Sequence, residues 1–401
     1  MNSASPSRSP RFKALARTVA AFLLAVLFLA EPVRAESARL VEVSDESQTY
    51  VGKVITSDNE MCCLIERTGH LRRLPVSSLK SFRVIGEQFV PLSAGQMCDE
   101  LRREIGQGYE VGATTHYVIC APSGKGQAYQ SLFEEIYRAV EKFYRVRGFR
   151  TTEPDGPLVA VVFASQSEFA NYCRRDDVAW SDGLRGYYSL RSNRVILFDD
   201  PVLFQNASVS SNRAGEGRGT AAVIYPGLRP EFQSMISGTA ADTVIHETTH
   251  QVGFNIGIHS RLGGTPQWII EGLATVLEAP GMRRRSAAHT LSDRINSERL
   301  DWFRTEYQPR RKLGDLATLI ASDEPFQRSV LDTYSHAWAF TFFLTDNPVR
   351  SRQFMTFIQR SEQQTAGVAV SAEDRLKLFQ EVFGDIARVE VDFQRWMDRL
   401  E

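Results

Sequence analysis

The stretch GTAADTVIHETTHQVGFNIG, residues 238–257, decides how the rest of the chain is organised. Its apolar and small residues recur at helical spacing and predict an amphipathic helix; they are Ala241, Val244, Ile245, Thr248 and Val252. His246 and His250 are four residues apart, so both imidazoles project from the same face of this helix. Two neutral imidazole nitrogens in that position can hold one Zn²⁺ ion at about 2.0–2.1 Å.

Glu247 follows His246 directly and completes an H-E-x-x-H motif. In this motif the Glu is not a ligand; it can act as a general base on a water molecule at the metal. The chain has only seven histidines, so the spacing favours a metal site over two histidines on a helix surface. The sequence therefore predicts His246 and His250 as ligands and Glu247 as a catalytic residue.

A third candidate ligand, Glu271, lies in WIIEGLA, residues 268–274. Thr265 and Pro266 are typical of a helix start, and Pro280 ends the predicted helix. Glu271 is thus expected in the first turns of a second helix. A catalytic zinc site uses three protein ligands and one open position, and His-His-Glu is a common set. The alternative is a carboxylate that the helix dipole favours near a helix N-terminus.

H-E-x-x-H followed by P-x-W-x-x-E-G-L-A resembles the gluzincin metallopeptidases, a peptidase-MA-like superfamily in which a downstream Glu is the third ligand. The segments HETTHQVGFNIGIHSR, GYYSLRSNRVILFDD and YSHAWAFTFFL also resemble a bacterial envelope family, domain-of-unknown-function family 1570. The resemblance covers roughly residues 90–400. It implies a zincin domain with a mixed-sheet upper lobe and a helical C-terminal lobe.

One position departs from the gluzincin pattern. Gluzincins of the thermolysin type carry an Asp four residues after the ligand Glu, where it orients a ligand His, and here that position is Thr275. Glu278 lies seven residues after Glu271 and on the same helical face. It is the candidate for the outer carboxylate that holds a ligand imidazole.

Beyond Glu271 the chain is predicted to be helical to its end, so residues 241–401 form the metal-site helix and a helical C-terminal lobe. TYSHAWAFTFFL, residues 333–344, is apolar nearly all round and predicts a central buried helix. Gluzincins commonly use a phenol or imidazole from this lobe to stabilise an oxyanion. The resemblance implies Tyr334 or His336 for that role. A core Tyr with a locally satisfied hydroxyl is the alternative for Tyr334.

Residues 97–240 predict an α/β lobe before the metal helix, with a long amphipathic helix at residues 127–147. GYYSLRSNRVILFD, residues 186–199, predicts a hairpin or an edge strand. In gluzincins the edge strand nearest the metal pairs with an extended peptide substrate. The resemblance therefore implies that Gly186–Ser189 line the cleft and that the partner is an extended peptide or protein.

Residues 36–92 predict a small all-β, barrel-like module of the Src-homology-like or Sm-like kind. Short alternating strands are expected at residues 40–43, 50–56, 61–66, 71–75 and 82–85, separated by turn signals. Such modules bind peptides, glycans or nothing at all. The fold class that follows is α+β: a small β module, then the zincin-like domain.

Residues 1–35 have the organisation of a signal peptide. A basic region is followed by an apolar core at Val19–Ala30 and by a small-x-small cleavage site before Glu36. A membrane-spanning helix needs about 20 apolar residues, and this core is shorter. The mature chain is expected to be secreted or periplasmic with no stable membrane span; an uncleaved N-terminal anchor is the alternative.

The composition is that of an ordinary folded protein, with 43% hydrophobic and 24% charged residues. A net charge of −1 gives no reason to expect a nucleic-acid partner. The basic clusters at residues 283–285 and 310–312 are expected to be solvated surface, or else to meet acidic substrate groups.

Five cysteines, Cys62, Cys63, Cys98, Cys120 and Cys173, all precede the metal helix, and none has C-x-x-C spacing. In an oxidising compartment a Cys98–Cys120 bridge is one possible pairing. Buried cysteines that act as small hydrophobic residues are the alternative.

These observations favour an exported zinc-dependent metallohydrolase, specifically a peptidase with a His-His-Glu zinc site and a Glu general base. Two alternatives remain open: a catalytically silent envelope binding or scaffold protein, and a zinc amidase acting on cell-wall material. The silent protein has no physical need for Glu247, because that residue is not a ligand.

Overall fold

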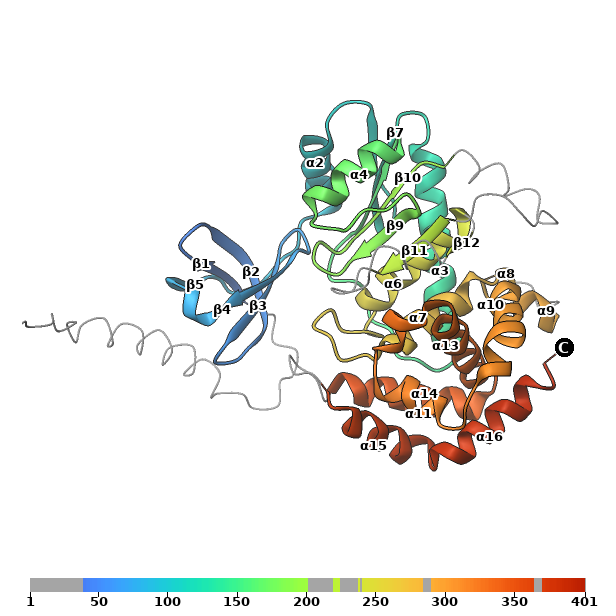
Figure 1. Cartoon of the computed structure of the whole chain (residues 1–401). Coiled ribbons are helices and arrows are strands. Elements are labelled where there is room, and N and C mark those ends of the chain that lie inside the picture. Colours follow the sequence, from blue (N-terminus) through green and yellow to red (C-terminus); the bar gives the residue numbers. More distant parts are fainter. Residues whose placement is uncertain are drawn as a thin grey trace, which may run out of the picture. The chain divides into compact units, whose positions relative to one another are not determined.

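The computed structural model describes residues 39–200, 219–223, 237–238, 240–283, 290–363 and 370–400 (Figure 1). The predicted signal peptide, residues 1–35, lies outside this part of the chain. The chain divides into two compact units, one ending at Leu92 and the other beginning at Ser93. Within the described ranges, no helix has both the length and the apolar sequence needed to cross a bilayer.

The first unit contains an antiparallel sheet in the order β4-β3-β2-β1-β5. Its elements are β1 (Leu40–Ser44), β2 (Thr49–Ser57), β3 (Met61–Glu66), β4 (Leu71–Pro75), the short helix η1 (Val76–Ser78) and β5 (Ser81–Gly86). Each strand lies within one residue of its predicted bounds, because the period of two is visible in the local sequence. Within residues 39–92 the pairing leaves β4 and β5 as edges and does not close a ring.

The second unit contains a mixed sheet in the order β12-β11-β9-β10-β8-β7-β6. Its strands are β6 (Tyr109–Ala113), β7 (Tyr117–Pro122), β8 (Leu158–Phe163), β9 (Leu184–Ser189), β10 (Arg194–Phe198), β11 (Gly219–Val223) and β12 (Ser237–Gly238). The helices before and between them are α2 (Ala94–Ile105), α3 (Gly126–Val146) and α4 (Gln166–Arg175). Strand β8 lies parallel to both of its neighbours, β7 and β10, whereas β9 is antiparallel to β10.

Helices cover both faces of this sheet at its centre. Along β8, Ala160 and Val162 belong to the core that includes α3 and helix α6 (Ala240–Asn255). On the other face, Phe163 packs against Tyr172 of α4 with ring centroids 5.1 Å apart. Every residue of β8 is buried, which explains why its sequence is a continuous apolar run.

The sequence predicts a hairpin or an edge strand at residues 186–199, and the structure contains the hairpin but not the edge position. The hairpin of β9 and β10 is present, but β11 pairs with the other side of β9 in parallel, with Ala222 opposite Tyr187. The outermost strand on this side is β12. The prediction that Gly186–Ser189 belong to an edge strand is therefore wrong. The short segment GTAAV of β11 has no apolar alternation that would reveal a strand.

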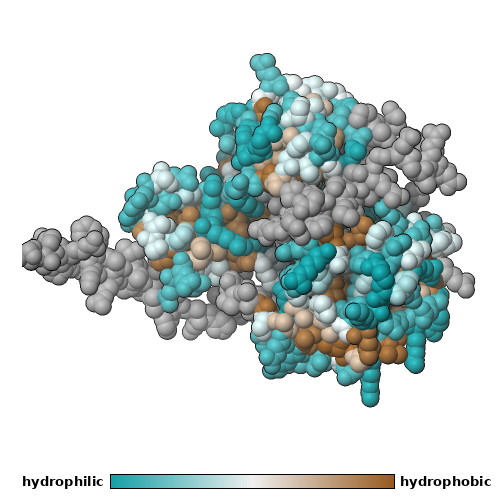
Figure 2. All heavy atoms as spheres, viewed as in Figure 1, coloured by the Kyte–Doolittle hydropathy of each residue, from teal (hydrophilic) through white to brown (hydrophobic). Residues whose placement is uncertain are grey.

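The remainder of the second unit is helical, as predicted. The helices are α7 (Gln267–Glu278), α8 (Pro280–Arg283), α9 (Leu291–Arg294), α10 (Ser297–Trp302), η3 (Phe303–Tyr307), η4 (Gln308–Arg310), α11 (Asp315–Ala321), α12 (Pro325–Arg328), α13 (Val330–Thr345), α14 (Pro348–Gln363), α15 (Ala372–Phe383) and α16 (Ile386–Met397). On the face shown in Figure 2, hydrophilic side chains cover most of the described surface. The overall class is mixed α+β, with a β-sheet module followed by a domain whose C-terminal part is helical.

The predicted central helix is α13, which is buried from Thr333 to Thr345. It packs along α7, and Gly272 marks their closest approach. A Cβ atom at Gly272 would overlap the Thr341 hydroxyl and lie 2.7 Å from the carbonyl oxygen of Ala337. A side chain at Gly272, next to Glu271, would therefore force the two helices to shift.

Two expectations about single residue types change in the structure. All five cysteines are free and buried, so the Cys98–Cys120 bridge is not formed. The second basic cluster is not wholly solvated surface, because Arg311 forms a buried ion pair with Glu390. Arg310 binds Asp332 through both terminal nitrogens. These arginines therefore have structural partners within the helical lobe.

Candidate metal centre

Helix α6 places His246, Glu247 and His250 inside the protein. Every residue from Thr243 to Phe254 is buried, because the sheet covers part of this helix and α7 and α3 cover other parts of it. The helix is thus enclosed more completely than the amphipathic pattern predicts. The two imidazole centroids lie 4.5 Å apart with their planes 81° to each other, so the rings meet edge to face, one turn apart.

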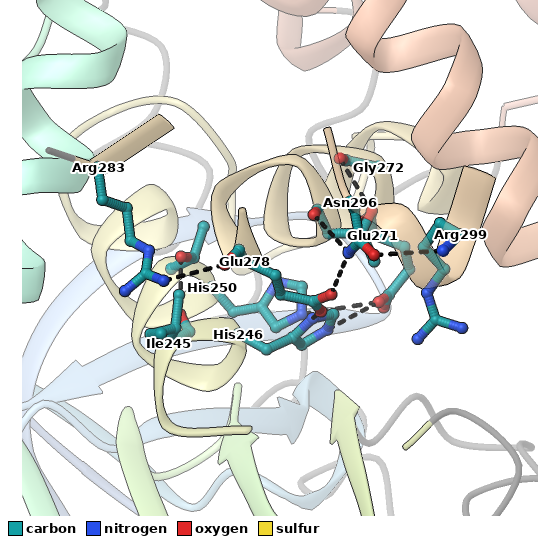
Figure 3. A network of polar contacts seen from close by, with 11 residues as sticks. Ile245, His246, His250, Glu271, Gly272, Glu278, Arg283, Asn296 and Arg299 are labelled. Carbon is teal, nitrogen blue, oxygen red and sulfur yellow. Dashed lines mark hydrogen bonds and ion pairs between the residues drawn. The ribbon is translucent and has the colours of Figure 1, made fainter. Parts of the chain in front are cut away.

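Helix α7 brings Glu271 against both imidazoles. Its Oε2 atom lies 3.1 Å from Nε2 of His246 and 3.7 Å from Nε2 of His250. The three candidate ligand atoms all lie within 4.8 Å of one another. Figure 3 shows these side chains pointing toward one another from the two helices. The structure therefore brings together the three ligands that the sequence predicts.

The geometry of these three groups fits a metal ion. In a tetrahedral zinc site with bonds of about 2.0–2.1 Å, ligand atoms lie roughly 3.3 Å apart. The two distances from Glu271 fall on either side of that value. Nε2 of His250 and Oε1 of Glu271 are buried and lack a hydrogen-bond partner in the described part of the chain. Because such atoms are costly to bury unsatisfied, the group could hold a divalent ion; nitrogen and carboxylate donors suit zinc and several related metals.

In the metal-free protein the two imidazoles have opposite pKa shifts. Burial opposes a charge on His246, but its hydrogen bonds to Glu271 and Glu278 outweigh burial and raise its pKa to about 10. Burial, together with the charge on His246, lowers the pKa of His250 well below its ordinary value. The contact of Nε2 of His246 with Glu271 thus favours a proton at the position that a metal ion would take. A metal ion has to displace this proton.

The structure confirms the predicted contact between Glu278 and a candidate ligand imidazole. Its Oε1 accepts a hydrogen bond from Nδ1 of His246 at 2.7 Å, and its Oε2 accepts one from Nδ2 of Asn296 at 2.7 Å. Thr275 instead donates its hydroxyl to the carbonyl of Glu271 at 2.7 Å. With Nδ1 engaged by Glu278, Nε2 of His246 faces Glu271, which is the orientation that metal ligation requires.

The carboxylate of Glu247 is held by the sheet. Its Oε2 accepts a hydrogen bond from the backbone N–H of Tyr188 in β9 at 2.7 Å, and the side chain is fully buried. A backbone donor of this kind fixes the direction of the carboxylate. Strand β9 is thus part of the site, although it contributes a backbone amide and not an open strand edge.

Tyr334 and His336 have different surroundings. The ring of Tyr334 meets Phe326 edge-on at 5.3 Å, and the guanidinium carbon of Arg299 lies 5.9 Å from its centroid. Arg299 belongs to α10 and is drawn with the polar network of Glu271 in Figure 3. Nδ1 of His336 instead bonds the hydroxyl of Tyr307 at 2.8 Å, and burial lowers the pKa of His336 to about 3.

The ring of His336 also stacks on Phe393 at 5.9 Å, within the aromatic core of the helical lobe. His336 is not part of the cluster formed by the three ligands. These contacts give His336 a place in the core, so the structure does not bring together all the residues that the resemblance implies.

Sequence reasoning missed Asn296 and the amide of Tyr188. Asn296 is the N-cap of α10, and an Asn before a short charged segment is a usable local signal for such a cap. Its contact with Glu278 joins segments that are 18 residues apart, and no local pattern reports it. The amide of Tyr188 carries no side-chain signal at all.

Fold and site together define an α+β protein with a buried His-His-Glu group that could hold a metal ion. Residues 240–367, which are 128 of the 401 residues, match the sequence model of the family described as "Protein of unknown function (DUF1570)". This match supports the resemblance to that family and includes all three candidate ligands. No curated protein matches the chain.

Proposed function

We propose that this protein is an exported zinc-dependent metallohydrolase and, more specifically, a gluzincin-like peptidase. The observation that carries the proposal is the buried group of His246, His250 and Glu271, with Glu247 held beside it. A hydrolytic zinc site needs three such donors and a nearby base that does not ligate the metal. The chain offers both on two adjacent helices.

A zinc ion bound there supplies Lewis acidity toward a water molecule and toward the carbonyl oxygen of a substrate. The Glu247 carboxylate accepts the proton of the attacking water and then passes it to the leaving amine nitrogen. The N–H of Tyr188 keeps that carboxylate in one orientation during both transfers. Glu278 holds His246 by its Nδ1 atom, so that Nε2 remains directed at the metal position.

Tyr334 is the candidate donor to the oxyanion of the tetrahedral intermediate. It lies on α13, which packs along the helix of Glu271, and its ring neighbours Arg299. Oxyanion stabilisation by one donor contributes about 10²–10³-fold to turnover. Tyr334→Phe is therefore expected to lower kcat by that factor while leaving the metal content unchanged. We prefer Tyr334 to His336 for this role, because the His336 ring stacks on Phe393 and bonds Tyr307 within the aromatic core.

A catalytically silent scaffold is the competing function, and the position of Glu247 weighs against it. This residue is fully buried and bonded to the sheet without being a ligand. Burying a carboxylate is costly even when one hydrogen bond offsets part of the cost, and a scaffold gains nothing from it. A zinc amidase that acts on cell-wall material would use the same residues. It would differ from a peptidase only in which substrates reach these residues. Because β9 is paired on both sides, it has no free edge to which an extended substrate could add as a further strand.

The test combines metal analysis with a cleavage assay on protein purified from the exported fraction. We expect about one zinc per chain, cleavage of a random peptide library, loss of cleavage with a chelator and recovery with zinc. Glu247→Gln is expected to keep its zinc and lose activity by several orders of magnitude. Zinc without cleavage of peptides or of cell-wall fragments would favour the scaffold. A chain that binds no metal would refute both hydrolase assignments.

A further inference from the structure

Asn296 connects the metal centre to the start of α10 through one side-chain amide. Its Nδ2 donates to Oε2 of Glu278 at 2.7 Å and to the carbonyl of Thr275 at 3.2 Å. Its Oδ1 accepts from the backbone N–H of Arg299 at 3.2 Å, which caps α10. A side-chain amide offers donors on one atom and an acceptor on the other. Asn296 therefore serves the helix and the carboxylate at the same time.

The contact with Asn296 settles how the Glu278 carboxylate is used. One oxygen receives Nδ1–H of His246 and the other receives the amide of Asn296 (Figure 3). A Glu side chain has three rotatable torsions and loses considerable freedom when it is held in one arrangement. Glu278 lies on the last turn of α7, and its side chain is still 11% exposed. A second anchor is what keeps such a side chain in a single position.

The need for this anchor follows from Thr275. Its hydroxyl donates to the carbonyls of Glu271 at 2.7 Å and of Gly272 at 3.0 Å, so it is used within its own helix. The imidazole of His246 then depends on a carboxylate from one turn further along α7. Asn296 binds that carboxylate and also the carbonyl of Thr275. Asn296 therefore holds the last turn of α7 and the Glu278 carboxylate in a fixed relative position.

We propose that Asn296 is a positioning residue of the metal centre, which acts through Glu278 to hold His246 in its metal-binding orientation. The inference rests on the metal site of the proposed function, but not on hydrolysis. It assigns a role in metal affinity to a residue that is not itself one of the three candidate ligands. Residues that orient a ligating imidazole affect metal affinity by about 10–100-fold.

The test uses the same substitution at two helix caps. Asn296→Ser keeps a good N-cap residue for α10 and removes the amide donor to Glu278. Asn347→Ser is the matched control, because Asn347 accepts from the N–H groups of Val349 at 2.8 Å and Arg350 at 3.2 Å at the start of α14, far along the chain from the ligands. Zinc dissociation constants are measured by chelator competition at fixed pH, and the melting temperature is measured on the metal-free proteins.

Asn296→Ser is expected to weaken zinc binding by about 10-fold, whereas Asn347→Ser leaves it unchanged and both variants melt within a few degrees of the wild type. Glu278→Gln is expected to weaken binding by about 10–100-fold. Adding Asn296→Ser to Glu278→Gln should cost less than about twofold more, since a Gln amide that accepts from His246 presents donors to Asn296.

Wild-type affinity in Asn296→Ser would overturn the proposal. So would an equal loss of affinity when Asn296→Ser is made in the wild type and when it is added to Glu278→Gln. Neither result depends on catalysis, so the hydrolase assignment would survive them. Conversely, Asn296 can affect zinc affinity through Glu278 in a protein that has no hydrolase activity. A wild-type chain without zinc affinity would overturn the metal centre and, with it, both proposals.

Discussion

Gly272→Ala tests how tightly the position of Glu271 depends on the crossing of α7 and α13. The new Cβ would overlap the Thr341 hydroxyl and lie 2.7 Å from the carbonyl oxygen of Ala337 and 2.9 Å from Cβ of Thr341. Normal contact between such atoms begins at about 3.5 Å, so the helices must separate by roughly 0.5–1 Å. Rotation of the Thr341 hydroxyl can relieve only part of the overlap, because the other contacts involve backbone and Cβ atoms.

The expected cost follows from two opposing terms. Overpacking a tight core position costs about 1–3 kcal/mol, whereas replacing Gly by Ala inside a helix returns about 1 kcal/mol of helix propensity. The net loss is about 0–2 kcal/mol in the free energy of unfolding. Because Gly272 follows Glu271 directly, the same displacement moves a ligand. Zinc affinity should therefore fall by at least about tenfold, since ligands must be held within about 0.5 Å of their working geometry.

Gly95→Ala is the matched control for this prediction. Gly95 lies in α2, and a Cβ added there would meet no atom within 4 Å. The same substitution should therefore stabilise the protein by about 0.4–1 kcal/mol and leave zinc affinity unchanged. Both variants are compared by urea unfolding of the metal-free protein and by chelator competition. A Gly272→Ala protein that is as stable as Gly95→Ala and binds zinc normally would refute the close crossing of the two helices.

Three further predictions follow from burial and linkage. Burial lowers the pKa of His336 from 6.5 to about 3, so as the pH falls the unfolded chain binds this proton before the folded protein does, and the folded protein loses stability. Between pH 6.5 and 5, the loss in the free energy of unfolding measured with urea should be about 2 kcal/mol smaller in His336→Asn than in the wild type. An equal loss in the two proteins would contradict this prediction. Burial raises the thiol pKa of all five cysteines, so Ellman's reagent should react with them only after the protein unfolds. Rapid labelling of the native protein would contradict the burial of these thiols. A free zinc concentration of 100 times the dissociation constant should add about 2.7 kcal/mol to the free energy of unfolding, and EDTA should remove this stabilisation. Identical melting curves with zinc and with EDTA would argue against the metal site.

The parts of the site that lie on helices could be predicted because helical spacing is a local property. His246 and His250 share a face through their separation alone, and Pro266 marks the start of α7. The predicted hydroxyl cap of α7 is not formed, because the hydroxyl of Thr265 bonds Glu362. The five strands of the first unit were accessible for the same reason, because alternation is visible within each segment.

The features that sequence could not supply all depend on contacts between distant segments. Strand β11 pairs with β9 through backbone atoms, and a five-residue segment of Gly, Thr, Ala and Val has no pattern that specifies this partner. The N–H of Tyr188 reaches Glu247 across 59 positions of sequence. The surroundings of His336 are a further example, because its bond to Tyr307 joins two helical elements of the core and no local pattern reports it.

The balance of charge explains why carboxylates, imidazoles and hydrogen-bond donors lie together at the candidate metal site. Three carboxylates, those of Glu247, Glu271 and Glu278, lie around two imidazoles, and at least two of the three are almost wholly buried. A single proton on His246 compensates only one of these negative charges, whereas a divalent ion compensates two and leaves both imidazoles neutral. The donors of Tyr188 and Asn296 are bonded to Glu247 and Glu278, the two carboxylates that do not ligate. Glu271 keeps an oxygen without a hydrogen-bond partner among the described residues. Glu271 is the carboxylate whose charge a cation between the imidazoles would compensate most directly, because its Oε2 atom lies 3.1 Å from Nε2 of His246 and 3.7 Å from Nε2 of His250.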